Sequence, residues 1–107
     1  MNAWYVIQTK PKKESEAKSY LSWKGLEIFL PLMESFSHKK GRIQREVKPL
    51  FPNYVFGSFD AVRDYTLVKY GKGVQKIVSF GFSPTPVSEL IIEEIKTKID
   101  ESGIVRR

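Results

Sequence analysis

The run of residues 53–59, Asn-Tyr-Val-Phe-Gly-Ser-Phe, constrains the fold of this chain more than any other segment. Its aromatic and β-branched composition predicts a β-strand. Because side chains alternate between the two faces of a strand, Tyr54 and Phe56 share one face. Val55 and Phe59 take the other face. A strand that is apolar on both faces is expected at the centre of a sheet, and helices, a missing domain or a partner must cover those faces.

The first third of the chain predicts a strand, a helix and a second strand. Residues 4–8 form a short aromatic and β-branched run, which indicates a buried strand. Pro11 fits the first turn of a helix over residues 12–24, and Gly25 is a natural stop. Residues 27–30 indicate a short strand before Pro31. Helical spacing places three residues toward the core and three lysines in solvent, namely Ala17, Tyr20 and Leu21 inside and Lys12, Lys13 and Lys18 outside.

The middle of the chain predicts a β-hairpin with a basic tip. Phe36 and residues 43–47 flank the tip, residues 38–42, whose sequence is His-Lys-Lys-Gly-Arg. The connector over residues 49–52, Pro-Leu-Phe-Pro, is expected to be rigid.

The last part of the chain predicts two helices around a further strand. Residues 61–70 indicate a short helix, and residues 74–78 indicate a strand after the glycine-rich turn at 71–73. Ser88 is expected to cap a final helix that Gly103 ends. The helix residues expected to pack are Val62, Tyr65, Leu67 and Val68 in the first helix and Ile92, Ile95 and Ile99 in the second.

This order of elements favours a single domain over residues 1–107 with an α+β fold. We expect a four-stranded, mainly antiparallel sheet of ferredoxin-like type, with flanking helices and a protruding hairpin.

Composition argues against several function classes. The chain has no cysteine and one histidine, His38, so neither a metal site nor a cofactor is expected. No run approaches about 20 consecutive apolar residues, and we expect a cytoplasmic protein with no membrane partner. The Gly-Lys-Gly turn at 71–73 lacks phosphate-loop spacing, and no nucleophile motif is present. An enzyme is therefore the weakest hypothesis.

Charge and aromatic residues favour a binding function. The net charge is +6, and residues 1–50 hold 10 Lys/Arg against 5 Asp/Glu, which suggests a polyanionic partner or a basic surface that aids solubility. Tyr20 and Trp23 lie among those lysines. Either Tyr20 packs in the core and Trp23 is partly buried, or their rings are available to stack on unpaired bases. Aromatic residues around the central strand either lie under the last helix or mark an interaction site. The lysines concerned are Lys10, Lys12, Lys13, Lys18 and Lys24.

Several of these residues resemble the N-terminal domain of the NusG family. The resemblance rests on Trp4-Tyr5-Val6, on Pro31 and above all on residues 49–56, Pro-Leu-Phe-Pro-Asn-Tyr-Val-Phe. With residues 78–81, Val-Ser-Phe-Gly, it is closest to the specialised RfaH-like members. It covers nearly the whole chain and implies a mixed α/β, non-catalytic domain that promotes processive, pause-resistant transcription and antitermination.

The resemblance implies that RNA polymerase is the main partner. An apolar depression in the family binds the clamp helices of the largest polymerase subunit, and we expect this chain to act as a monomer. By position, the residues of that depression are Val6, Phe51, Tyr54, Phe56 and Phe80, with Ile92 and Ile95 at its rim. RfaH-like members make a second contact, with the opposite polymerase subunit. Of the residues that make it, only one is matched in this sequence, at Thr66.

The resemblance also implies contacts beyond the clamp. RfaH-like members read the non-template DNA strand, and the matching positions are Lys10, Tyr20, Trp23, Lys24 and Lys72. A C-terminal KOW β-barrel in the family recruits Rho or the ribosome, and these 107 residues hold none, so we expect an isolated N-terminal domain or a shorter natural protein. The alternative function is a generic basic nucleic-acid-binding module.

Overall fold

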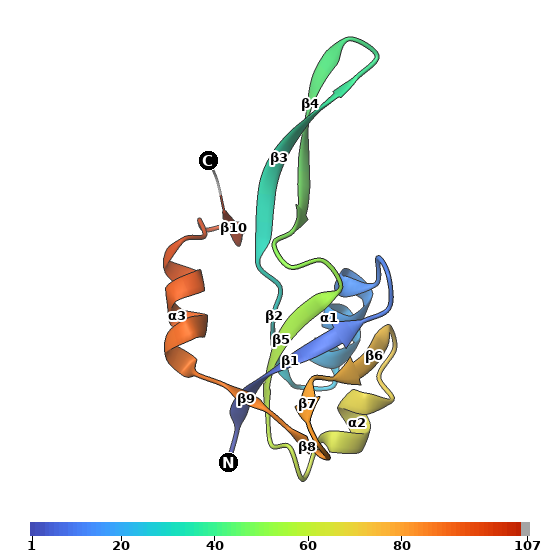
Figure 1. Ribbon diagram of the computed structural model, residues 1–107, viewed down its shortest axis with the longest axis vertical. Coiled ribbons are helices and arrows are strands. Elements are labelled where there is room, and N and C mark those ends of the chain that lie inside the picture. The colour runs from blue at the N-terminus through green and yellow to red at the C-terminus, as the bar shows by residue number, and fades with distance from the viewer. Residues whose placement is uncertain (106–107) are drawn as a thin grey trace.

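Strands β1 and β5 form the centre of the fold (Figure 1). The computed structural model describes residues 1–105. The two strands pair antiparallel, with Ala3 opposite Phe59 and Gln8 opposite Tyr54. The main sheet has the order β2-β5-β1-β6, and the short strand β9 extends it beside the start of β1. Its strands are β1 (Ala3–Thr9), β2 (Glu27–Phe29), β5 (Tyr54–Phe59), β6 (Val74–Ile77) and β9 (Pro86–Val87).

The prediction of an α+β fold with an antiparallel sheet is confirmed, as is the central position of residues 53–59. The structure adds β9 as a fifth strand. Val55 and Phe59 are fully buried in the larger core cluster, and Phe56 belongs to a second cluster on the opposite face.

One face of the sheet is covered by α1 (Glu14–Trp23) and α2 (Tyr65–Lys69). Ala17 and Leu21 of α1 are fully buried, and Tyr20 packs partly buried against the same cluster, as predicted. The helix begins two residues later than predicted because Lys12 adopts a positive φ of 61°, which an α-helix excludes.

Helix α2 is shorter than the predicted residues 61–70. The Asp60 carboxylate accepts hydrogen bonds from the N–H groups of Val62 and Arg63, so a turn precedes the helix. Val62 points into solvent and is 92% exposed, so the prediction that it packs is wrong. Val68 is fully buried and Tyr65 is partly buried, as predicted.

Helix α3 (Glu89–Thr97) lies on the opposite face of the sheet (Figure 1). The predicted Ser88 cap is confirmed, because its Oγ accepts a hydrogen bond from the N–H of Leu90 at 3.2 Å. The helix ends before Gly103, which instead turns the chain into β10 (Ile104–Val105) with a φ of 80°. Strand β10 then pairs parallel with β3 at the base of the hairpin.

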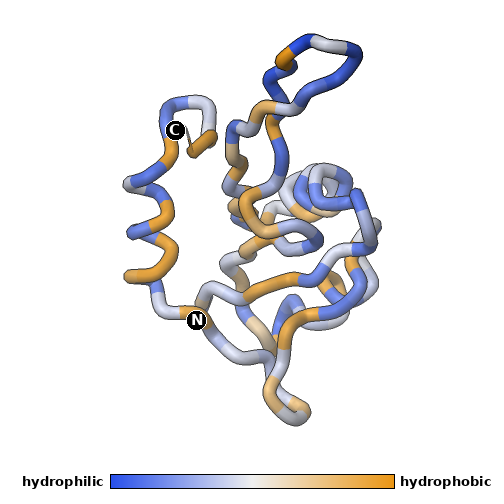
Figure 2. Tube along the Cα trace, turned by 45° about the horizontal axis from the view of Figure 1, so that its top comes forward, coloured by the Kyte–Doolittle hydropathy of each residue, from blue (hydrophilic) through white to orange (hydrophobic). Residues whose placement is uncertain are grey.

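The hairpin of β3 (Leu32–Lys39) and β4 (Arg42–Pro49) projects from the body of the domain (Figure 1), and its tip is hydrophilic (Figure 2). Lys40 and Gly41 form a two-residue turn with φ values of 54° and 75°, as a type I′ turn requires. Glu46 lies 3.0 Å from Lys48 and 3.4 Å from Lys39. The hydrogen bond from Lys48 is the main cause that lowers the pKa of Glu46 to about 2.

The smaller strands β7 (Ser79–Phe80) and β8 (Ser83–Pro84) pair with each other.

The close approach of the 71–73 turn to α1 yields a test of the fold. A Cβ at Gly73 would lie 3.2 Å from the Ala17 nitrogen and the Lys13 oxygen, both backbone atoms, whereas a Cβ at Gly41 would meet nothing within 4 Å. Both glycines have positive φ. We expect Gly41→Ala to lower the free energy of unfolding by about 1 kcal/mol. Gly73→Ala should cost at least about 1 kcal/mol more, because it adds a backbone clash. Urea titrations measure both values, and equal losses would contradict the close packing.

The Asp60 turn yields a pH prediction. The Arg63 N–H is the main cause that lowers the pKa of Asp60 from 3.8 to about 2, and the N-terminal ammonium, 3.0 Å away, is the next cause. A lowered folded-state pKa stabilises the fold above the unfolded pKa, and that stability is lost as the pH falls from about 4 to about 2. Asp60→Asn should therefore lower the Tm at neutral pH and flatten its pH dependence in this window. Glu46 titrates in the same window, so part of the slope should remain. An unchanged slope would contradict the assignment.

Candidate functional site

The face of the sheet under α3 is only partly covered. Trp4 of β1, Phe56 of β5 and Ile92 of α3 form a buried cluster, and Ile92 is fully buried. Four further residues are partly buried against this cluster, namely Val6, Phe29, Val87 and Ile95. The Lys96 ammonium lies 5.3 Å from the Trp4 ring centre, which adds a cation–π contact between α3 and β1.

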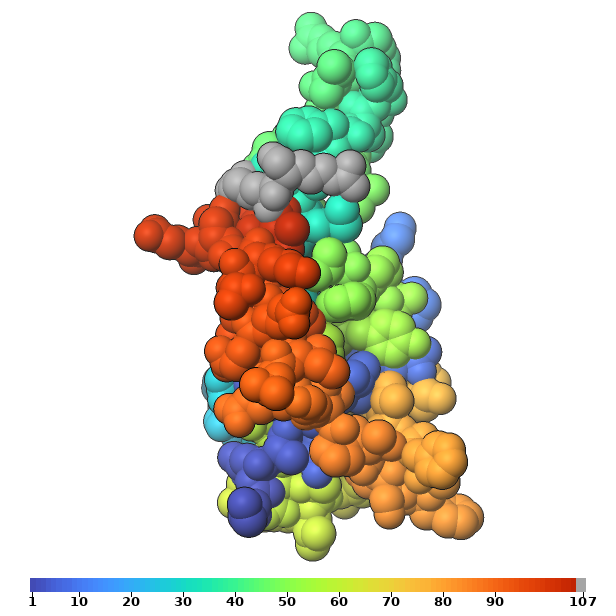
Figure 3. Space-filling model, turned by 60° about the vertical axis from the view of Figure 1, so that its left-hand side comes forward, coloured from blue at the N-terminus to red at the C-terminus, as the bar shows by residue number. Residues whose placement is uncertain are grey.

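Three aromatic side chains stay exposed around the strands of this cluster, namely Tyr54 on β5, Phe51 in the loop that precedes β5 and Phe80 on β7 of the separate β7–β8 pair. Phe51, Tyr54 and Phe80 are 40%, 37% and 88% exposed, and Val6 is partly buried. Figure 3 shows atoms of β1 between α3 on one side and the β5 and β7–β8 segments on the other. We call these four residues, Val6, Phe51, Tyr54 and Phe80, the aromatic surface.

The packing of Phe51 and Phe56 holds the aromatic surface against the buried cluster. The Phe51 ring meets the Phe56 ring edge to face, with centroids 5.8 Å apart and an interplanar angle of 86°. The backbone N–H of Tyr54 donates to the Phe51 oxygen at 3.1 Å, which closes the turn between the two residues. The surface is therefore built on the rigid core.

Phe56 and Ile92 do not line an open groove as expected, because Phe56 lies beneath α3 and Ile92 is the α3 side chain that packs in the same buried cluster. The sequence prediction centred the groove on Tyr54 and Phe56 and placed Ile92 at its rim. Phe56 is 7% exposed and Ile92 is fully buried, so both support the aromatic surface from below. Ile95 of α3 is partly buried against the cluster. Leu90 and Ile91 of the same helix are exposed apolar residues that the sequence analysis did not identify.

The attachment of α3 depends mainly on one side chain and can be tested. Ile92→Ala should lower the free energy of unfolding by about 2–5 kcal/mol, because it leaves a cavity under α3. Hydrogen exchange should speed up in α3 more than in β1 and β5. Leu90→Ala is the control, and because Leu90 is exposed it should change stability by about 0.5 kcal/mol or less. Equal losses for the two variants would contradict the packing.

A second surface lies along α1. Trp23 is 77% exposed and Tyr20 is partly buried, and both line a hollow of about 280 Å³. The Lys24 ammonium lies 4.8 Å from the Trp23 ring centre and 5.6 Å from the Tyr20 ring centre. We call this the α1 hollow, and its lining residues are Glu16, Ser19, Tyr20, Trp23 and Lys72.

The predicted basic residues are only partly brought together. Lys13 and Lys72 approach the Glu16 carboxylate at 3.6 Å and 3.4 Å, so both lie at the α1 hollow. Lys10 lines a different hollow with Lys69, and Lys12 lines another with Lys48. Thr66 is exposed on α2.

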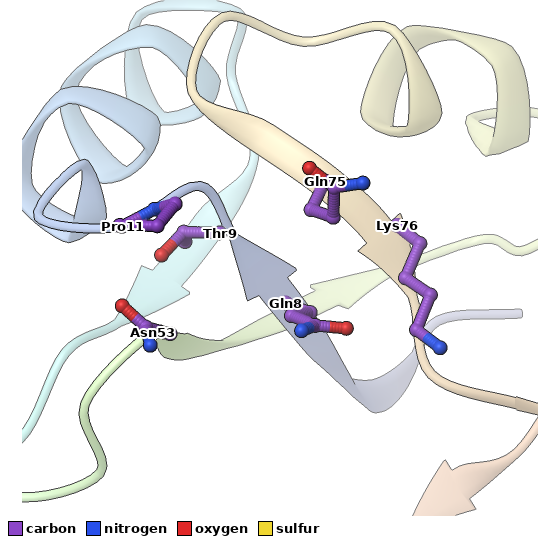
Figure 4. A pocket seen from close by; sticks show the side chains of 6 residues that line it. All are labelled: Gln8, Thr9, Pro11, Asn53, Gln75 and Lys76. Atoms are coloured by element: carbon purple, nitrogen blue, oxygen red, sulfur yellow. The ribbon is translucent and has the colours of Figure 1, made fainter.

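A polar hollow at the end of β1 was missed by the sequence analysis. Gln8, Asn53 and Gln75 place side-chain amides around it, with Lys76 beside them (Figure 4). Thr9 also lines it, and its buried Oγ1 has no hydrogen-bond partner among residues 1–105. In the sequence, only the separate amide residues Gln8, Asn53 and Gln75 indicate this hollow.

The described part of the chain contains neither a candidate metal-binding cluster nor a helix suited to span a membrane. Within residues 1–105 no three His, Asp or Glu side chains group so that they could hold a metal ion. None of the helices in this range has the length and apolar composition needed to cross a membrane.

Comparison with known proteins adds to this geometry. The family model described as transcription termination factor nusG matches residues 2–96. The chain is also similar to a solved structure titled "Domain interaction in Thermotoga maritima NusG", with a TM-score of 0.67 and 24% identity. The match covers 89% of this chain and 55% of the Thermotoga maritima chain, so this chain spans about half the length of that relative. At this identity the likeness shows the fold.

Proposed function

This chain belongs to the NusG family of transcription factors, and we propose that it binds RNA polymerase through the aromatic surface. The observation that carries the proposal is the exposure of three aromatic side chains, Phe51 before β5, Tyr54 on β5 and Phe80 on β7. In this proposal the domain promotes processive, pause-resistant elongation and antitermination as a non-catalytic module.

The proposed occupant of the aromatic surface is a helix of the polymerase clamp. An amphipathic helix binds when its apolar face lies against exposed apolar side chains, and one ring of this surface, Phe51, packs edge to face against the buried Phe56. Tyr54 has a hydroxyl as well as a ring, and tyrosine is enriched at protein interfaces. The resemblance described above supplies the identity of the helix, in the largest subunit.

The test is binding of this domain to a clamp-helix fragment. We expect Tyr54→Ala and Phe80→Ala each to weaken binding about 10- to 30-fold, as central aromatic residues of an interface do. Tyr70→Ala is the matched control, because Tyr70 is also exposed but follows α2 on the opposite face of the sheet. It should leave affinity unchanged. Equal effects of Tyr54→Ala and Tyr70→Ala, or no binding by the wild type, would contradict the proposal.

We further propose that the α1 hollow contacts an unpaired nucleic-acid strand, the non-template DNA of an RfaH-like member. Trp23 offers an exposed ring for stacking, and Lys24 and Lys72 place charge beside it. A generic nucleic-acid-binding module is the alternative, supported by the same lysines. That alternative predicts strongly salt-dependent nucleic-acid binding carried by Lys10, Lys12, Lys13 and Lys24, with little effect of Tyr54→Ala on that binding.

Two further contacts complete the proposed function. Thr66 is exposed on α2 and is proposed to touch the opposite polymerase subunit. Recruitment of Rho or the ribosome would use a C-terminal domain outside these 107 residues.

A further inference from the structure

We propose that the α1 hollow selects a single unpaired guanine. The proposal rests on the nucleic-acid contact proposed above and adds the identity of the base. Its origin is the Glu16 carboxylate, which lines the hollow together with Tyr20 and Trp23.

The hollow follows one face of α1. Glu16, Tyr20 and Trp23 are separated by four and three residues, the spacing that aligns side chains along a helix. Ser19 is the fourth lining residue on the helix, and Lys72 closes the hollow from the 71–73 turn. A ring for stacking and a carboxylate for hydrogen bonding therefore line the same hollow.

Stacking binds a base without discriminating between the four bases. Every base has a π face, so Trp23 and Tyr20 accept all four bases. The Lys24 ammonium beside both rings attracts the phosphate of a stacked nucleotide. Selection must come from a group that meets the edge of the base.

The Glu16 carboxylate can make that selection. Its oxygens lie 3.6 Å from Lys13 and 3.4 Å from Lys72, longer than close hydrogen bonds, so lone pairs remain for a ligand. Guanine presents two adjacent donors, N1–H and the N2 amino group, which match the two carboxylate oxygens. Adenine and cytosine place a ring-nitrogen acceptor beside the amino group, and thymine flanks its single N–H with two carbonyls. A carboxylate therefore favours guanine over the other three bases.

Lys13 and Lys72 offset the negative charge of Glu16 in this arrangement. A carboxylate repels the phosphates of a bound strand. The two ammonium groups flanking Glu16 offset that repulsion, so the carboxylate can remain at the hollow without excluding nucleic acid.

The experiment is fluorescence anisotropy with labelled nine-nucleotide thymidine strands that carry one central dG, dA, dC or dT. We expect the dG strand to bind about tenfold more tightly than the others, as one bidentate contact allows. A central deoxyinosine, which lacks the N2 amino group, should bind with intermediate affinity. Glu16→Gln should reduce the dG preference to about twofold or less. Glu27→Gln, at an exposed position on β2, should retain it.

The outcomes separate this inference from the proposed function. If the wild type binds all four strands equally and Trp23→Ala weakens them all, guanine selection is wrong and the nucleic-acid contact stands. If no strand binds, both are wrong. A dG preference that survives Glu16→Gln, in a variant whose melting curve matches the wild type, would overturn the role of the carboxylate.

Discussion

The antiparallel pair of β1 and β5 is apolar on both faces, and the rest of the structure depends on covering it. Helices α1 and α2 bury one face completely, around Ile7, Val55 and Phe59. Among residues 1–105 the opposite face is covered by α3, which attaches through Ile92 to Trp4 and Phe56. This unequal cover leaves the aromatic surface open, and the proposed docking of a polymerase helix would complete the burial that the chain itself does not supply.

The two proposed binding surfaces lie on opposite faces of the main sheet, because α1 packs on one face and α3 on the other. A helix on the aromatic surface would therefore leave the α1 hollow accessible to a nucleic-acid strand. The chemistry of the two surfaces also differs. The first is apolar and built on the core, whereas the second combines an exposed indole with the ammonium groups of Lys24 and Lys72 and the carboxylate of Glu16.

Much of the fold followed from periodicity and turn residues, because local patterns determine where elements form. The central strand, α1, the hairpin and the Ser88 cap were predicted this way. The errors came from interactions that sequence patterns do not reveal. Asp60 bonds the N–H groups that would begin α2, and Lys12 takes a positive φ. The depth of Phe56 was also not predictable, because it depends on how α3 crosses the sheet. The α1 hollow was not predictable from local patterns because Lys72 lines it, and only the tertiary structure places Lys72 beside Glu16.

The most direct test of the account is an NMR titration of the isotope-labelled domain with the clamp-helix fragment. The account predicts chemical-shift changes centred on Val6, Phe51, Tyr54 and Phe80, with the Trp23 indole signal unchanged. Shift changes gathered on α1 or on the hairpin, or no changes at saturating fragment, would contradict the claim that the aromatic surface is the polymerase-binding surface.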